Sequence, residues 1–189
     1  MSHKAAIIDR IQSIQLEEAP LPVIPRFKYP EGETISTFVA MAEKAGARVL
    51  CTENEAHTYA VINGKVTGQK HYYSAFHDSK PLQDATTEEL AELTVAIYKA
   101  PLGVAENGAV WIGEDALPQR VGIAIVEQLV IVVKVDNIVY NMHEAYQTIE
   151  PQALGYGVFV SGPSKTADIE QSLVVGAHGA CGLTVIVEK

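Results

Sequence analysis

The residues best suited to chemistry are concentrated in one stretch near the end of the sequence, from Tyr156 to Gly179. An apolar run, Tyr156 to Val160, is typical of a buried strand, and a turn of small residues follows it. The next residues predict a helix that extends through Val175. A glycine turn between a strand and a helix directs backbone N–H groups and the positive end of the helix dipole at one place, which favours an anion. The candidate ligand-binding residues of this stretch are Ser161, Gly162, Ser164, Lys165, Thr166, Asp168 and Gly179.

Specific nucleotide and nucleophile motifs can be tested on this stretch, and none of them fits. Gly157 and Gly162 have the spacing of phosphate-loop glycines, but Pro163-Ser164 stands where Lys-Ser/Thr is required. A dinucleotide fingerprint fails because its glycines would precede the strand instead of following it. The glycines of a nucleophilic serine elbow are absent around Ser161. Anion binding and simple helix capping, with Asp168 in a capping box, therefore both remain open.

Two other side chains are candidate catalytic groups. Glu106 lies in a Glu-Asn-Gly turn before an apolar strand, where it could be a nucleophile, base or ligand, or a solvated turn residue. Gly108 of the same turn is a candidate ligand contact. His178, between glycines, could be a general acid or base, although capping or packing is the favoured interpretation. The spacing of His71 and His77 matches no standard metal site, so no metal site is predicted.

These candidates need a scaffold, and the hydrophobic pattern predicts alternating helices and strands. Helices are expected over Thr34–Ala45, from a Thr86/Glu89 capping box through Leu93 and Ile97, and from an Asp136 cap to Ile149. Short apolar runs predict strands at Arg48–Thr52, Thr58–Ile62, Ala109–Ile112, Arg120–Ile125, Leu129–Val133 and Leu183–Val187. Such alternation predicts an α/β fold with a mainly parallel sheet covered on both faces.

The first 30 residues are expected to differ from the rest. Residues 2 to 16 place Ile7, Ile8, Ile11 and Ile14 on one side of a helix, which we expect to pack on the body. Four prolines between residues 19 and 30 then predict an extended connector. The sequence therefore divides into a helix and Pro-rich connector, residues 1–30, and an α/β domain, residues 31–189.

Composition restricts the classes of partner and cofactor. The chain has 189 residues, is 48% hydrophobic and carries a formal net charge of −9, which argues against nucleic acid or an anionic membrane as the main partner. Cys51 and Cys181 are too few to hold an iron–sulfur cluster or a structural zinc, so no cofactor held by this chain alone is predicted. Lone cysteines, no signal peptide and no apolar segment long enough to span a bilayer favour the cytoplasm.

The sequence resembles a known family at several places. SGPSKTADIEQSLVVGAHG, followed by the strand LTVIV, resembles the C-terminal signature of the LUD-domain family of lactate utilization proteins (LutC/YkgG-like). AENGAVWIG resembles the family's segment around the glutamate turn, and the helix from Thr34 also fits. The chain departs at Asn107, Ala109, Ala177 and Ala180, where the family has threonines, valine and proline.

The resemblance implies a fold and a role. The fold would be a three-layer α/β/α arrangement like that of the NagB, ribose-5-phosphate isomerase and CoA-transferase group. The role would be an accessory or ligand-binding part in the oxidation of L-lactate to pyruvate, alongside iron–sulfur partner proteins. The implied site residues are Glu106, Gly108, Gly162, Ser164, Thr166, Asp168, Glu170, His178 and Gly179.

An enzyme in its own right is the alternative. The Glu106 turn also looks like the glutamate turn of class I CoA-transferases, where the glutamate forms a thioester with CoA. The turn at Gly162 could then hold a phosphate. A fold without activity and a possible homo-oligomer are also left open.

Overall fold

The centre of the molecule is a five-stranded sheet in which every pair of neighbouring strands is parallel. The computed structural model describes residues 3–14, 20, 22–25, 27, 29–30, 32–76, 82–149, 155–167, 173–176 and 178–189. The strand order is β1-β11-β6-β3-β2. The predicted α/β class with a mainly parallel sheet is confirmed. The strands are β1 (Arg48–Thr52), β2 (Tyr72–Ser74), β3 (Val95–Ala100), β6 (Gln128–Lys134) and β11 (Gly182–Glu188).

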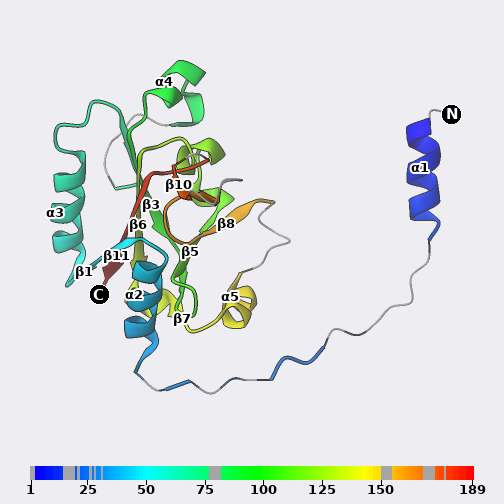
Figure 1. Ribbon diagram of the computed structural model, residues 1–189, viewed down its shortest axis with the longest axis horizontal. Coiled ribbons are helices and arrows are strands. Elements are labelled where there is room, and N and C mark those ends of the chain that lie inside the picture. The colour runs from blue at the N-terminus through cyan, green and yellow to red at the C-terminus, as the bar shows by residue number, and fades with distance from the viewer. Residues whose placement is uncertain are drawn as a thin grey trace.

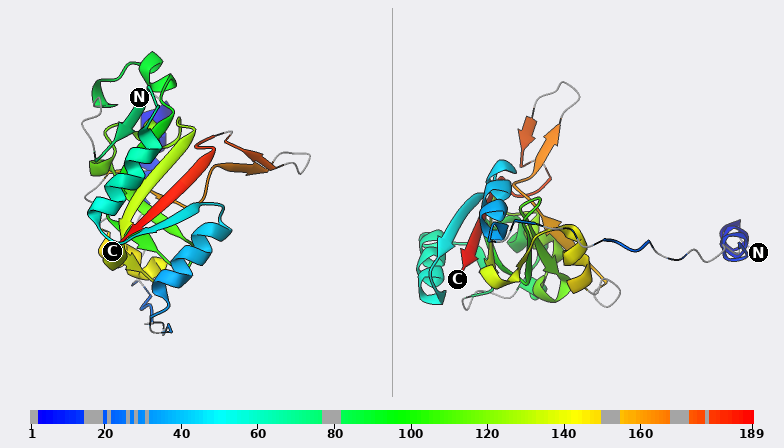
Figure 2. Two further views of the ribbon diagram at one scale, coloured as in Figure 1. Left: turned by 90° about the vertical axis from the view of Figure 1, so that its left-hand side faces the viewer. Right: turned by 90° about the horizontal axis from the view of Figure 1, so that it is seen from below.

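One face of this sheet is covered by helix α3 (Glu55–Val66), which lies against the sheet in Figure 2. Its Ile62 packs into an apolar cluster with Ile97, Val130 and Ile186 of the sheet. The strand predicted at Thr58–Ile62 is therefore wrong. The side chain of Asn54 accepts a hydrogen bond from the His57 N–H at 2.9 Å and caps the helix, and tertiary packing holds Gly64 inside it.

The other face is covered by a second, smaller sheet. Its strands are β4 (Leu102–Val104), β5 (Ala109–Gly113), β7 (Ile138–Val139) and β8 (Gly157–Val160), in the order β7-β4-β5-β8. The main core lies between the two sheets and includes Phe38 and Ala42 of helix α2 (Thr34–Lys44). Helix α5 (Met142–Thr148) packs behind the second sheet through Ala145. Figure 1 shows α3 and α5 on opposite sides of the two sheets.

The helix predicted after the glycine-rich turn is wrong. The first and last residues of the predicted helix instead form a two-stranded antiparallel ribbon, β9 (Lys165–Ala167) and β10 (Leu173–Val175), with Lys165 opposite Val175. Figure 2 shows this ribbon projecting from the body. Thr166, Val174 and Val175 are β-branched and favour strands, and Gly176, at φ +84°, ends the second one. Asp168, Glu170 and Gln171 lie outside the described residues.

Other predicted elements are right in kind but wrong in extent. The capping box of Thr86 and Glu89 is present, but α4 (Thr87–Ala91) stops before Leu93, and Ile97 belongs to β3. The run from Arg120 contains a short 3-10 turn, η3 (Arg120–Ile123), instead of a strand. Further 3-10 turns are η1 (Leu82–Asp84), η2 (Glu114–Ala116) and η4 (Val135–Asn137). Asp136 lies in η4, and the helix after it begins only at Met142.

The N-terminal helix α1 (His3–Gln12) forms as predicted, but it does not pack on the body. None of its residues is buried, and Figure 1 shows it well separated from the sheets. The described residues between 20 and 30 form neither helix nor strand, as the prolines predict. Among the described residues, no helix combines the length and apolarity that crossing a bilayer requires. Among the described residues before Thr34, the exposed large apolar side chains are Ile7, Ile8, Ile11, Ile14, Val23, Ile24 and Phe27.

The backbone of α2 near its C-terminal end is in direct contact with two glycine turns. Gly108, in the turn between β4 and β5, has φ +62°, and a Cβ there would overlap the N and Cα of Ala42. Gly162, in the turn after β8, has φ +73°, and a Cβ there would overlap the carbonyl oxygen of Ala45. Both the backbone conformation and the space therefore require glycine.

The hydroxyl of Tyr98 is an exception to the packing of the main core. The side chain is fully buried between the sheets, and its oxygen has no hydrogen-bond partner among the described residues. Burial, and secondarily the neighbouring Tyr73, raises the pKa of Tyr98 well above its ordinary value of 10.0. The hydroxyl is therefore a cost to folding that the aromatic ring offsets by packing.

We expect Tyr98→Phe to leave the free energy of unfolding unchanged or to raise it by about 1 kcal/mol, because it removes an unpaired buried hydroxyl and keeps the ring. The control is Thr58→Val, which breaks the 2.7 Å hydroxyl pair of Thr58 and Thr52 and should lower stability by about 1 kcal/mol. Urea denaturation at pH 7 measures both. A loss with Tyr98→Phe as large as that with Thr58→Val would show that the hydroxyl is paired.

The same variant should change the pH dependence of stability. Because the pKa of Tyr98 is raised in the folded chain, the unfolded chain ionises first as pH rises above 10.0. The part of the free energy of unfolding that depends on this difference in pKa is therefore fully present below pH 10.0 and is lost as pH rises beyond it. Above pH 10.0 the native chain should lose up to about 1.4 kcal/mol per pH unit more than Tyr98→Phe. Denaturation midpoints between neutral pH and high alkaline pH test this, and equal slopes would contradict it.

We expect Gly108→Ala to lower the free energy of unfolding by about 3 kcal/mol. The added Cβ would displace the backbone of α2, and the alanine would have to adopt a left-handed backbone conformation. Gly64→Ala is the control, since Gly64 lies within α3 with open space around it and should gain about 0.5–1 kcal/mol. Thermal unfolding followed by circular dichroism compares the two. An unchanged melting temperature for Gly108→Ala would show that the turn does not press on α2.

Candidate functional site

The two turns singled out by the sequence lie side by side. Strands β5 and β8 pair antiparallel with Val110 opposite Val160, which brings the start of one next to the end of the other. The Ser161 hydroxyl donates a hydrogen bond to the carbonyl oxygen of Asn107 at 2.8 Å. The structure therefore brings the Glu106 turn and the Ser161 turn together on α2, although they are more than 50 residues apart in sequence.

Strand β8 belongs to the second sheet, so the turn at Gly162 does not follow a strand of the parallel sheet. The rule that ligands bind beyond the carboxyl ends of parallel strands does not apply to it. The turn also precedes a β-ribbon instead of a helix, so no helix dipole is directed at it. The physical reason for predicting an anion at this turn is thereby removed. Binding of a ligand at Ser161, Gly162, Ser164 or Thr166 stays a prediction, but it no longer has this physical support.

Lys165 is the cation of this turn, and it already has a partner. Its ammonium donates a hydrogen bond to the carbonyl oxygen of Ala45 at 2.5 Å, although the side chain is exposed. Positive charge is favourable at the C-terminal end of a helix, where carbonyl groups lack intrahelical partners. In this structure Lys165 therefore stabilises the end of α2.

Ser164 and Gly179 lie in contact at the base of the β-ribbon. The Ser164 backbone donates to Ala180 O at 2.9 Å and accepts from the Gly176 N–H at 3.0 Å. A Cβ on Gly179 would lie 3.1 Å from the Cβ of Ser164. His178 is exposed next to this contact, and no described residue pairs with its ring to orient it as an acid or base.

Glu106 is held at the N-terminal end of α5. Its backbone N–H donates to Tyr140 O at 2.9 Å, and its Oε1 accepts from the Met142 N–H at 2.8 Å. Glu144 takes a similar part, because its Oε2 accepts from the Tyr140 N–H at 3.0 Å while the Asn141 side chain caps the helix. Glu106 is exposed to solvent nevertheless, and one of its carboxylate oxygens is left for other interactions.

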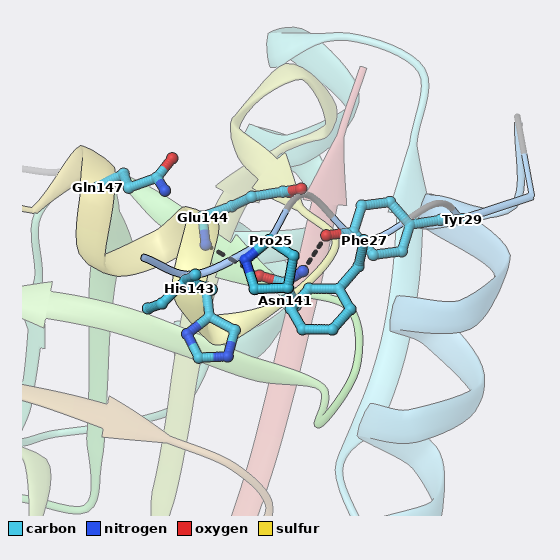
Figure 3. Close-up of a pocket in the computed structure, with 8 residues that line it drawn as sticks. Pro25, Phe27, Tyr29, Asn141, His143, Glu144 and Gln147 are labelled. Carbon is cyan, nitrogen blue, oxygen red and sulfur yellow. Dashed lines mark hydrogen bonds between the residues drawn. The ribbon is translucent and has the colours of Figure 1, made fainter. Parts of the chain in front are cut away.

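A pocket of about 420 Å³ opens beside this helix end, between α5 and the connector (Figure 3). The ring of Phe27 stacks on His143 with centroids 5.7 Å apart, and the ring of Tyr29 stacks on Tyr140 at 4.0 Å. The Asn141 amide donates a hydrogen bond to the Tyr29 hydroxyl. The lining residues are Ile24, Pro25, Phe27, Tyr29, Asn141, His143, Glu144 and Gln147.

The hydroxyl of Tyr29 in this pocket is partly desolvated and lies near carboxylates. Desolvation, followed by a hydrogen bond and charge repulsion from Glu144, raises the pKa of Tyr29, with a smaller contribution from Glu106. A tyrosine hydroxyl is neutral at physiological pH, so Tyr29 can donate or accept a hydrogen bond. A pocket of this size with aromatic walls and a few polar groups suits a small polar molecule.

Sequence reasoning did not identify this pocket. Its signals were two aromatic residues in a proline-rich segment and a polar run, Asn141 to Glu144, at a helix start. Neither signal gives the spatial proximity of residue 27 to residue 143. Among the residues that the structure describes, no group of three or more His, Cys, Asp or Glu side chains is placed to hold a metal ion. His71 pairs with Glu92 at 3.4 Å, and His77 lies outside the described residues.

Comparison with known proteins identifies, across most of the chain, the LUD domain family that the sequence resembles. The LUD domain matches residues 59–187. Lactate utilization protein C 1 of Bacillus mycoides (strain KBAB4) is 32% identical over 111 residues, which are 56% of this chain and 47% of that protein. Lactate utilization protein C of Oceanobacillus iheyensis is 31% identical over 100 residues, which are 49% of this chain and 42% of that protein. The matched region is thus less than half the length of either relative.

A solved structure agrees on the fold. The crystal structure of a DUF162 family protein from Deinococcus radiodurans superposes with a TM-score of 0.68 at 15% identity, covering 86% of this chain and 100% of that chain. At this identity the similarity concerns the fold alone. The LUD domain match covers well over half of the 189 residues and includes both glycine turns. The chain belongs to the LUD domain family.

Proposed function

We propose that the chain is an accessory or ligand-binding component of L-lactate utilization, acting in the oxidation of L-lactate to pyruvate. The observation that carries the proposal is the LUD domain match together with two curated relatives named lactate utilization protein C. The Glu106 turn and the Gly162 turn, which both resemble the family's segments, meet on α2. Shared sequence features that are also close in space are typical of a common functional surface.

The proposal includes iron–sulfur partner proteins. Oxidation of lactate to pyruvate releases two electrons and two protons, and the electrons need an acceptor. Two cysteines are fewer than the four that ligate a Cys₄ iron–sulfur cluster, so partners would carry the clusters. The exposed side of the two turns, with Glu106 and Ser161 at the surface, is available for a partner or a ligand.

A deletion experiment tests this function. We expect a strain lacking the gene to lose growth on L-lactate as sole carbon source and to regain it with the native gene, while growth on pyruvate stays normal. An affinity-tagged chain from lactate-grown cells should retain proteins that contain iron and acid-labile sulfide. Normal lactate oxidation in the deletion strain would refute the proposal.

A CoA-transferase-like activity is the second candidate, favoured by one observation. Glu106 is exposed on its turn, and among the described residues the Met142 N–H is the one donor to its carboxylate, at Oε1. The Glu106 carboxylate would attack an acyl-CoA carbonyl and expel CoA thiolate, forming a mixed anhydride. The thiolate would then attack the glutamyl carbonyl, releasing the acyl group as a carboxylate and leaving a Glu106–CoA thioester.

Trapping tests that candidate. Borohydride reduces a glutamyl thioester to an alcohol, so mass spectrometry after saturating acyl-CoA should find Glu106 without one oxygen and with two more hydrogens. Glu144 is the internal control, because its Oε2 accepts from Tyr140 N and its side chain is half-buried. An unmodified Glu106 removes the enzyme interpretation and leaves the lactate role to the deletion experiment.

Variants of Glu106 separate chemistry from capping. Glu106→Ala should lower the free energy of unfolding by about 1 kcal/mol, because Met142 N loses its acceptor. Glu106→Gln keeps an oxygen acceptor and should cost less than half as much. If Glu106 serves only as a cap, Glu106→Gln supports growth on lactate. If its carboxylate reacts, Glu106→Gln abolishes activity in a stable protein, as urea denaturation and growth rates measured together would show.

A further inference from the structure

A second cavity, of about 330 Å³, lies at the carboxyl ends of the parallel strands, on the face covered by α3. It is bordered by the first turn of α3, by Phe76 and by the ends of β3, β6 and β11. Figure 2 shows α3 on this face of the sheet. In open parallel sheets this edge is where ligands bind, because the connections after the strands leave space there. Nothing in the Glu106 turn or the Gly162 turn contributes to this cavity.

Strand register places three ionisable side chains on the same side of this cavity. Lys134 of β6 is opposite Glu188 of β11, and Lys99 of β3 is opposite Val132 of β6. Side chains alternate along a strand, so Lys99, Lys134 and Glu188 face the same way as Ile97, Val132 and Ile186 two residues earlier. Those three apolar residues form the cluster beneath α3. The cavity therefore receives two ammonium groups and one carboxylate from three adjacent strands.

Glu188 is the unusual member of this group. The residue is only 6% exposed, and its Oε2 has no hydrogen-bond partner anywhere in the described residues. No ion pair joins it to Lys134 in that part of the chain, although the two are in register. A buried carboxylate oxygen without a donor is costly, and native proteins rarely leave one so. A donor supplied by a ligand would remove that cost.

The two lysines are exposed and have no acidic partner in the part of the chain that the structure describes. The ammonium of Lys99 lies 4.3 Å from the centroid of the Phe76 ring, which holds it at the cavity wall. Lys189 lines the cavity too, but its ammonium is paired with both oxygens of Glu53 at 2.9 Å. The remaining acidic side chain of the wall, Glu55, is exposed in the first turn of α3. Lys99 and Lys134 are thus available for an anion.

We propose that this cavity binds a small organic anion that also carries a hydroxyl group. The anionic group lies between Lys99 and Lys134, and the hydroxyl donates a hydrogen bond to the Oε2 of Glu188. Phe76 and Val132 supply apolar contacts for the carbon atoms between them. The choice of L-lactate as the test molecule rests on the function proposed above, whereas the site itself rests on the cavity and on Glu188.

Titration of the ¹⁵N-labelled chain, residues 1–189, by NMR tests the site with three probes. L-Lactate has the carboxylate and the hydroxyl, pyruvate has a carbonyl acceptor in place of the hydroxyl, and propionate has the carboxylate alone. We expect L-lactate to bind about tenfold more tightly than pyruvate, because a carboxylate oxygen accepts a hydrogen bond from the lactate hydroxyl but has no proton to give to the pyruvate carbonyl. The residues that shift should include Lys99, Lys134 and Glu188.

Glu188→Gln gives the sharpest readout. It removes a negative charge, which strengthens binding of every anion, so the ratio of the two dissociation constants is the quantity to compare. Because an amide can accept from lactate or donate to pyruvate, the preference for lactate should fall by about tenfold. Propionate binding should not weaken. An unchanged ratio would overturn the assignment of Glu188.

Lysine variants locate the anionic group. Lys134→Met and Lys99→Met keep the aliphatic chain and should each weaken L-lactate about tenfold. Lys4→Met, on the separate helix α1, is the matched control and should change nothing. An equal effect of Lys4→Met, or no binding of L-lactate to the native chain, would refute the site. The growth experiment is independent of this titration. If the chain does not bind L-lactate in the cavity but the deletion strain still loses growth on L-lactate, the site is refuted and the lactate role is not.

Discussion

The close approach of two glycine turns to helix α2 is the contact on which the arrangement of the candidate site depends. Gly108 and Gly162 contact the backbone at Ala42 and Ala45, and each has a positive φ that residues other than glycine rarely adopt. Their contacts fix the Glu106 turn beside the Ser161 turn, and Ser161 bonds Asn107 across the junction. A glycine at either position is therefore explained by packing alone, whether or not a ligand binds nearby.

Three strands of the parallel sheet could be predicted from sequence because they are short apolar runs, and β1, β6 and β11 were predicted almost at their observed bounds, whereas β2 was not predicted and Ile97 of β3 was assigned to a helix. The segment from Lys165 to Val175 was predicted wrongly, because polar and apolar residues spaced over eleven positions fit a helix or two short paired strands equally well. Thr58 to Ile62 was misassigned for a related reason. Four of its five residues favour strands, and only the Asn54 cap and the packing of Ile62 on the sheet select a helix.

The sequence identified residues that meet at the two turns, but not the two cavities. The pocket beside α5 requires Phe27 to stack on His143, and no local pattern links positions so far apart. The other cavity requires β3, β6 and β11 to be neighbours in a known register. Glu188, at the end of an apolar strand, resembles a solvated terminal residue until that register places it beneath α3.

Glu106 and Glu188 differ in whether the folded chain already satisfies their carboxylate oxygens. Glu106 is exposed, and the Met142 N–H satisfies one of its oxygens, so its present environment leaves the folded chain without an electrostatic deficit. Glu188 is buried, and its Oε2 is unsatisfied in the described structure, so folding has desolvated a carboxylate oxygen without replacing water. A ligand hydroxyl at Glu188 would recover energy already spent on burial, whereas a ligand at Glu106 would compete with bulk water. The two carboxylates therefore differ in what a bound molecule can gain from them, and that gain is larger at the carboxyl edge of the parallel sheet.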